Sequence, residues 1–138
     1  MSIKKLDHVS IAVADMDEAL RLYRDVLGLE VTRRVHLEDR QLDIAFIRVG
    51  DTELELIRPL SEDTTVARFL ERRGPGLHHI CFRVDDVAES MREIGARGLQ
   101  FIESEPQPGA VGLVCFIHPA SVNGVLIELS QPLDNGGT

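Results

Sequence analysis

A chain of 138 residues, 43% of them hydrophobic, has enough material for one folded domain with an apolar core. Its formal net charge of −8 excludes general nucleic-acid binding, which requires a basic surface. The two cysteines form no CxxC motif or disulfide framework, and no apolar run suggests a signal peptide or a membrane span, so we expect a soluble cytoplasmic protein.

The first half of the chain predicts a β-α-β-β-β module. Residues 5–13 show the alternating and then continuous apolar pattern of a part-buried strand. Asp15, with Glu18 three residues later, is typical of a helix N-terminus, and apolar residues at helical spacing continue to Gly28, which should end the helix. Three more strands are predicted over residues 29–34, 42–49 and 52–58, the last two joined by a hairpin turn at Gly50-Asp51.

The second half predicts the same order of elements. Asp86 and Glu89 form a second cap pattern, and Gly98 follows the helix that they begin. The strands are predicted over 77–84, 99–103, 113–117 and 124–130, with a loop rich in Pro and Gly before the third. We therefore expect one domain over 5–131, with module one at 5–60, a linker helix within 61–75, module two at 76–131 and a tail at 132–138.

The two modules are a duplication. The string Leu6-Asp7-His8-Val9-Ser10 aligns without a gap on Leu77-His78-His79-Ile80-Cys81, 71 positions later. Towards the end of each module, Glu53-Leu54-Glu55-Leu56 aligns on Leu126-Ile127-Glu128-Leu129 at an offset of 73. One His therefore begins each module and one Glu closes it, at equivalent positions.

This repetition predicts a metal site. Two imidazoles and two carboxylates suit a divalent transition ion and leave positions open for substrate or water. The Glu of the second module lies in a strongly apolar strand, where a lone charge needs a partner. The predicted ligands are His8, Glu55, His79 and Glu128.

Three other histidines are not assigned to this site. His78 is adjacent to His79 but aligns with Asp7, so the repeat register selects His79. His36 and His118 have no repeat partner and are interpreted as ordinary surface or turn residues.

Paired β-α-β-β-β modules with His and Glu on their first and last strands resemble the vicinal oxygen chelate superfamily, which includes glyoxalases, bleomycin resistance proteins and dioxygenases. Within it, several strings are most similar to the methylmalonyl-CoA epimerase family: Leu6-Asp7-His8-Val9, Phe69-Leu70-Glu71-Arg72-Arg73-Gly74, Gly76-Leu77-His78-His79-Ile80 and Gly124-Val125-Leu126-Ile127-Glu128. The resemblance implies an α+β fold in which two tandem βαβββ modules form an eight-stranded, partly open barrel-like sheet around a metal-binding cleft.

The resemblance also implies an isomerase that is a homodimer and acts on an acyl-CoA. The implied reaction is a metal-dependent epimerisation that inverts C2 of methylmalonyl-CoA or a similar acyl-CoA through an enolate held by the metal. Cobalt or zinc is the metal implied first, with nickel or manganese as alternatives.

A 1,1-proton transfer of this kind needs an acid or base on each face of the carbon. The family residue that is both a base and a metal ligand on the final strand maps to Glu128. The second base lies on the strand before the Gly-Asp turn, which maps to Asp43, with Asp39 or Glu38 as alternatives.

Two other functions fit parts of the pattern. The same four ligands suit a glyoxalase I-type lactoylglutathione lyase. A bleomycin-resistance-type protein that binds its ligand without catalysis has the same modules and needs no metal. An extradiol dioxygenase is disfavoured because its iron is held by two His and one carboxylate, whereas this chain offers a fourth ligand.

Overall fold

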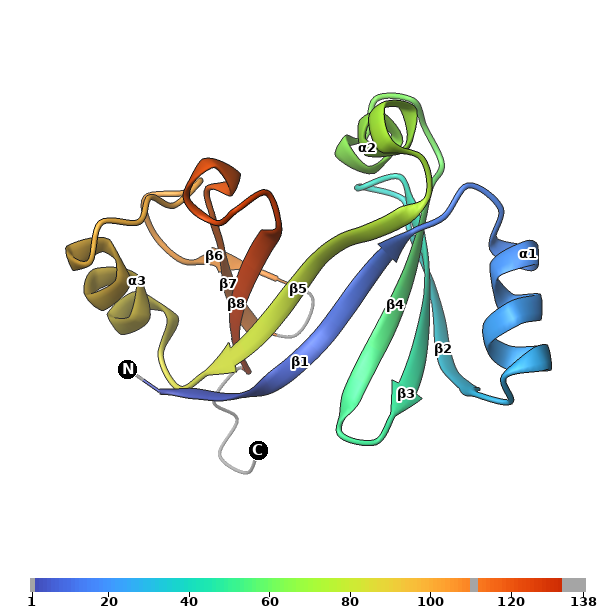
Figure 1. Ribbon diagram of the computed structural model, residues 1–138, viewed down its shortest axis with the longest axis horizontal. Helices are drawn as coiled ribbons and strands as arrows, with labels where there is room; N and C mark the ends of the chain where they lie inside the picture. The colour runs from blue at the N-terminus through green and yellow to red at the C-terminus, as the bar shows by residue number, and fades with distance from the viewer. Residues whose placement is uncertain (1, 110–111, 133–138) are drawn as a thin grey trace. The chain divides into compact units, whose positions relative to one another are not determined.

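The computed structural model describes residues 2–109 and 112–132 and has a mixed α+β fold (Figure 1). Its eight strands hydrogen-bond in the order β2-β3-β4-β1-β5-β8-β7-β6. The strands are β1 (Ile3–Ala12), β2 (Glu30–Leu37), β3 (Leu42–Val49), β4 (Thr52–Pro59), β5 (Gly76–Val84), β6 (Gln107–Pro108), β7 (Gly112–Ile117) and β8 (Leu126–Pro132). The helical segments are α1 (Met16–Leu20), a π-helical turn η1 (Arg21–Val26), α2 (Thr65–Arg73), α3 (Val87–Ala96) and a 3-10 turn η2 (Pro119–Ser121).

This order confirms the predicted α+β class and an eight-stranded sheet made of two similar halves, although β6 does not lie where the corresponding strand was predicted. Residues 133–138, which make up most of the predicted tail, lie outside the described part of the chain, as do residues 110 and 111 of the loop rich in Pro and Gly.

The chain divides into two compact units whose bounds differ from those of the sequence modules. Unit 2 is the continuous segment 8–78, and unit 1 combines residues 1–7 with residues 79–138. Both boundaries fall inside strands, because β1 is divided between Asp7 and His8 and β5 between His78 and His79. The two predicted ligand histidines are therefore the first residues after each boundary.

In unit 2, helical segments cover both faces of the sheet. The helix α1 begins at Asp15, whose side chain accepts a hydrogen bond from the backbone N–H of Glu18 at 3.0 Å, as the cap pattern predicts. The helix then continues as the π-helical turn η1 and ends before Gly28, which has a φ of +74°. The face of the sheet beside α1 is packed by Val13, Met16, Leu20, Ala45, Ile47 and Leu56.

The opposite face of this sheet packs against α2. The helix begins at Thr64, whose hydroxyl accepts a hydrogen bond from the N–H of Ala67 at 3.0 Å. Val66 is buried here together with Ala12, Ile44, Phe46 and Ile57, and Phe69 and Leu70 pack against the same cluster. The linker helix predicted within 61–75 is thus α2.

In unit 1, α3 covers one face of β7 and β8 through a core of Val84, Val87, Ile94, Cys115 and Leu129. The cap prediction holds again, because the side chain of Asp86 accepts from the N–H of Glu89 at 3.0 Å. Gly98 follows α3 with a φ of +103°.

The strand predicted over 99–103 is wrong. This segment makes only an isolated bridge from Phe101 to Ile117, while the two-residue β6 pairs with Leu113 and Val114 of β7. Phe101 packs on the core beside α3, but the neighbouring Ile102 is 53% exposed. The alternating apolar pattern of this segment therefore reflects its packing on the core, although the segment forms no continuous ladder with a neighbouring strand.

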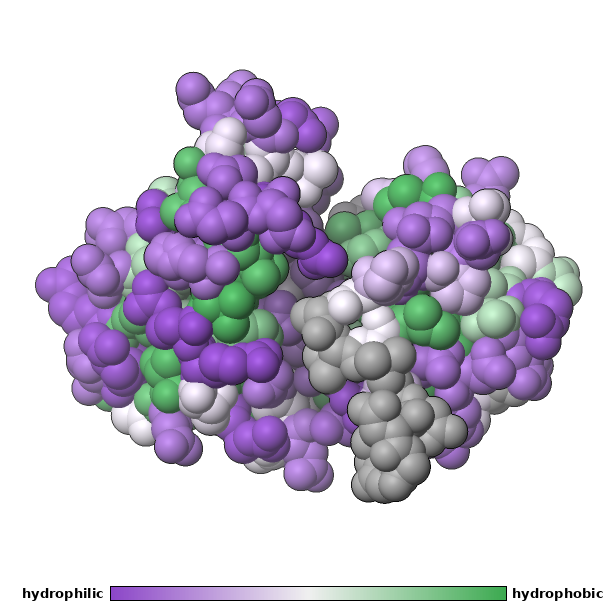
Figure 2. Space-filling model, turned by 180° about the vertical axis from the view of Figure 1, so that it is seen from behind, coloured by the Kyte–Doolittle hydropathy of each residue, from purple (hydrophilic) through white to green (hydrophobic). Residues whose placement is uncertain are grey.

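The surface visible in Figure 2 is mainly polar. Hydrophilic residues predominate on this face, and apolar residues occur in small groups between them. Among the described residues, no helix has both the length and the apolar character needed to cross a membrane.

Candidate functional site

The first predicted ligand pair lies within unit 2. His8 on β1 and Glu55 on β4 are neighbours on one face of the sheet, and His8 Nδ1 lies 3.3 Å from Glu55 Oε2. His8 is 8% exposed, and the exposed fraction of the Glu55 side chain is 14%. The two donor atoms are therefore adjacent and nearly removed from water.

The second pair lies within unit 1 and joins the same two residue types, but through the other imidazole nitrogen. His79 on β5 and Glu128 on β8 are both 8% exposed, and His79 Nε2 lies 3.1 Å from Glu128 Oε1. The ring of Phe116 packs edge-on against the His79 imidazole, with 5.8 Å between the ring centres. Phe116 lies directly opposite Glu128 in the ladder, just as Phe46 lies opposite Glu55 in unit 2.

Each unit thus carries a nearly buried pair of one imidazole nitrogen and one carboxylate oxygen. These donor types fit a divalent transition ion, because imidazole and carboxylate both suit metals such as zinc, cobalt, nickel and manganese. A bound divalent cation would also offset the cost of removing a carboxylate from water. The donor set is therefore compatible with a metal.

The structure also separates the two adjacent histidines of β5. His78 belongs to unit 2 and packs edge-on against Phe69 of α2, with 5.1 Å between the ring centres. His79 makes the pair with Glu128. His36 and His118 are exposed, as predicted, and the His118 ring caps η2 by accepting from the N–H of Ala120 at 3.2 Å.

Asp43 is placed differently from the ligand pairs. In the regular β3–β4 ladder Phe46 lies opposite Glu55, and Asp43 lies opposite Arg58. Because side chains alternate between the faces of a strand, Asp43 projects from the other face of the sheet than Phe46 and Glu55. That is the face covered by α1.

The Asp43 carboxylate is already engaged on that face. It is 2% exposed, and its oxygens accept from Nη2 of Arg34 at 3.2 and 3.3 Å and from Nε of Arg58 at 3.4 Å. A carboxylate that accepts hydrogen bonds from two guanidinium groups is held in one orientation by them. This placement favours a structural role, and the predicted role of Asp43 as a base stays a prediction.

The two alternative acids lie elsewhere in unit 2. Glu38 and Asp39 are exposed residues of the turn between β2 and β3. The turn is closed by the Gln41 side chain, whose amide donates to the carbonyl of Glu38 at 2.7 Å.

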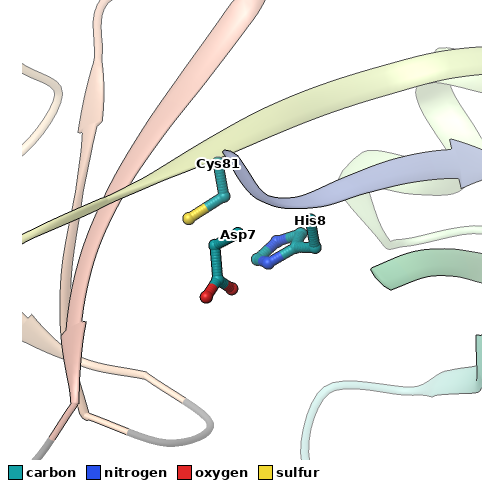
Figure 3. A group of neighbouring side chains, drawn as sticks. All are labelled: Asp7, His8 and Cys81. Atoms are coloured by element: carbon teal, nitrogen blue, oxygen red, sulfur yellow. The ribbon is translucent and has the colours of Figure 1, made fainter. Parts of the chain in front are cut away.

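A further acidic residue lies close to a cysteine within unit 1. A carboxylate oxygen of Asp7, on β1, lies within 4.8 Å of the sulfur of Cys81, on β5 (Figure 3). Asp7 is, however, paired with Arg83, whose Nη2 lies 2.6 Å from its Oδ1. We therefore interpret Asp7 as the partner of Arg83.

The second cysteine is inert. Cys115 lies on the α3 side of β7, is fully buried, and packs in the core. Burial, reinforced by the nearby carboxylate of Glu103, raises the pKa of its thiol to about 12. The thiol therefore remains protonated near neutral pH and is no nucleophile.

Sequence reasoning missed the residues that contact Glu55 and Asp43. Ser10 donates to Glu55 Oε1 at 3.3 Å, and two strands supply the arginines that hold Asp43. A signal for Ser10 was present, because it aligns with Cys81 in the duplication. The arginine contacts depend on strand register, which the sequence does not show directly.

Comparison with known proteins extends over nearly the whole chain. The sequence profile of the glyoxalase/bleomycin resistance protein/dioxygenase superfamily matches residues 7–117. The ethylmalonyl-CoA/methylmalonyl-CoA epimerase of Cereibacter sphaeroides is 41% identical, covering 94% of this chain and 98% of its own length. The uncharacterized protein YqjC of Bacillus subtilis is 39% identical, covering 94% of each chain.

A solved structure shares the fold. It is a serine-to-threonine variant of the Streptomyces coelicolor methylmalonyl-CoA epimerase in complex with 2-nitronate-propionyl-CoA. The match has a TM-score of 0.87 and 31% sequence identity, and it covers 96% of this chain and 97% of that one.

Proposed function

Because the chain belongs to the glyoxalase/bleomycin resistance protein/dioxygenase superfamily, we propose that it is an epimerase that inverts C2 of methylmalonyl-CoA or a similar acyl-CoA. The similarity of 41% over almost the full length of an ethylmalonyl-CoA/methylmalonyl-CoA epimerase supports the isomerase class. The bound 2-nitronate-propionyl-CoA in the S. coelicolor enzyme supports an acyl-CoA substrate.

The observation that carries the proposal is the repeated His–Glu pair. We propose that His8, Glu55, His79 and Glu128 together hold one divalent metal ion, with cobalt or zinc favoured over nickel or manganese. When bound, such an ion would polarise the substrate oxygens next to C2 and stabilise the negative charge that develops on proton removal.

The protein supplies the proton transfers. We propose that Glu128 removes the proton from one face of C2, because its carboxylate is nearly buried and lies beside the imidazole of His79. A second carboxylic acid delivers a proton to the opposite face, which inverts the centre. Burial of Glu128 excludes water, which would otherwise compete as the proton acceptor.

The test of Glu128 uses the exchange of the C2 hydrogen of methylmalonyl-CoA with deuterium, followed by NMR, together with elemental analysis of the same sample. The wild-type protein should bind stoichiometric metal and exchange the hydrogen. Glu128→Gln should weaken metal binding and abolish exchange, whereas Glu30→Gln, an exposed glutamate on β2, should change neither. A metal-loaded wild-type protein that does not exchange the C2 hydrogen would refute the epimerase proposal.

A second candidate function is distinguished from the epimerase by its substrate. A glyoxalase I-type lyase would form lactoylglutathione from methylglyoxal and glutathione with the same ligand set. Appearance of lactoylglutathione without C2 exchange would assign the lyase. Tight stoichiometric metal would count against the non-enzymatic ligand-binding function, which needs no metal ligands.

The second proton-transfer group is proposed from the family resemblance. Asp43 is the residue to which the family resemblance maps, with Asp39 and Glu38 as alternatives. Asp43→Asn should leave metal binding intact and, if Asp43 is the second base, reduce epimerisation strongly. Full epimerisation by the folded variant would exclude Asp43 and direct the same test to Asp39→Asn and Glu38→Gln.

We further propose that the protein is a homodimer, as the family resemblance implies, and that it is cytoplasmic, as expected from the sequence. Sedimentation equilibrium should give a mass close to twice the 15.4 kDa of the chain. A concentration-independent mass of one chain would refute the dimer.

A further inference from the structure

Ser10 is a buried hydroxyl next to the His8–Glu55 pair. It lies two residues after His8 in β1 and faces Glu55 directly in the parallel β1–β4 ladder. Its exposed fraction is 0%, and its hydroxyl donates to Glu55 Oε1 at 3.3 Å. A serine in this position has no access to water and is oriented by its protein neighbours.

The two oxygens of Glu55 therefore have different partners. Oε1 accepts from Ser10, and Oε2 lies 3.3 Å from Nδ1 of His8. A glutamate side chain has three rotatable bonds, so a carboxylate without such a contact could turn either oxygen towards the imidazole. The Ser10 hydroxyl fixes which oxygen lies beside His8 and limits the rotation of the carboxylate.

The second module differs at the equivalent position. Cys81 faces Glu128 in the parallel β5–β8 ladder, as Ser10 faces Glu55. A thiol is a weaker hydrogen-bond donor than a hydroxyl, and this one donates to Ser130 Oγ at 3.3 Å. The duplication thus keeps the His and the Glu in both modules but places a hydroxyl opposite the Glu in only one.

We propose that Ser10 is a positioning residue that holds the Glu55 carboxylate in the orientation that binds a divalent metal. This inference deepens the proposed function, on which it rests, by assigning Glu55 the role of a fixed ligand. Loss of a partner that orients a metal ligand typically weakens metal binding about 10- to 100-fold.

The experiment measures Co²⁺ binding by the whole purified protein, by competition with a chromophoric chelator, and records the visible absorption of the bound ion. Ser10→Ala should raise the dissociation constant about 10-fold, at the low end of the range because 3.3 Å is a long hydrogen bond. Ser10→Thr retains the hydroxyl and should recover most of the affinity. The visible spectrum should change in Ser10→Ala and return towards that of the wild type in Ser10→Thr.

The matched control is Cys81→Ala, which removes a side chain of similar size at the equivalent position of the other module. Its dissociation constant for Co²⁺ should stay within about 2-fold of wild type, because the thiol is a poor donor. Equal weakening by Cys81→Ala and Ser10→Ala would overturn the inference, as would unchanged binding in Ser10→Ala. Urea unfolding of the metal-free variants corrects for any loss of folded protein.

The experiment distinguishes failure of this inference from failure of the proposed function. A wild-type protein that binds no stoichiometric Co²⁺ would refute the metal-dependent function and, with it, this inference. A wild-type protein that binds Co²⁺ tightly, with unchanged affinity in Ser10→Ala, would refute only the role of Ser10.

Discussion

Replacing Asp43 by asparagine tests whether this residue stabilises the fold. Asp43→Asn preserves the shape of the side chain and one acceptor oxygen but removes the charge that faces two guanidinium groups. The wild-type contacts are 3.2–3.4 Å long, and the carboxylate is 2% exposed. Removing one partner of a fully buried ion pair costs about 3–5 kcal/mol.

The expected magnitude here is smaller because the arginines are partly in water. The exposed fractions of the Arg34 and Arg58 side chains are 44% and 34%, so solvent screens their charges after the substitution. The introduced amide would also keep one hydrogen bond, a contribution of about 1 kcal/mol. We therefore expect the free energy of unfolding to fall by about 1–3 kcal/mol.

Urea unfolding followed by circular dichroism measures this change directly. With a slope of about 2 kcal/mol per molar urea, typical of a small protein, the midpoint should fall by roughly 0.5–1.5 M while the slope stays constant. Asp25→Asn is the control: Asp25 pairs with Arg24 at a shorter 2.8 Å, but both side chains are half-exposed, so the midpoint should hardly move. An Asp43→Asn midpoint equal to that of wild type would show that the buried ion pair contributes nothing to stability.

Three further predictions concern unit 1. Asp86→Ala removes the cap of α3 and should cost about 1 kcal/mol, a decrease in Tm of several degrees by calorimetry; an unchanged Tm would refute the cap's contribution. Gly109→Ala would place a Cβ 2.5 Å from Cγ1 of Val114, so we expect a loss of about 1–3 kcal/mol in urea unfolding, whereas a neutral effect would show that Val114 can move aside. In a Cys81→Ala background, Cys115 should resist a thiol reagent at about pH 8 until urea unfolds the protein, since its pKa is raised to about 12; rapid labelling of the folded protein would contradict its burial.

The sequence predicted best the features that depend on neighbouring residues. The cap residues Asp15 and Asp86 each accept the predicted backbone hydrogen bond, because a cap needs only a short side chain and the first helical turn. The strand predicted over 42–49 has the observed bounds, since a run of apolar residues ends there at a Gly-Asp turn.

Features that depend on the partner strand were harder to predict. The residues at 107–108 pair with β7 although they include a proline, which is tolerated because β6 is an edge strand. The face on which Asp43 lies was also hard to predict, because a shift of the strand register by one residue moves every side chain to the other face. Only the ladder with β4 shows that Asp43 and Glu55 project from opposite faces.

The boundaries of the compact units have a consequence for how the duplicated chain is completed. Residues 1–7 belong to unit 1 with the second half of the chain, where Asp7 binds Arg83 and Lys4 lies 3.3 Å from Asp85. A shorter chain with a single module would therefore offer its opening segment to another copy and receive one in return. When two modules are fused in one chain, each module receives the strand segment from the other module of the same molecule. Folding of the domain then no longer depends on protein concentration.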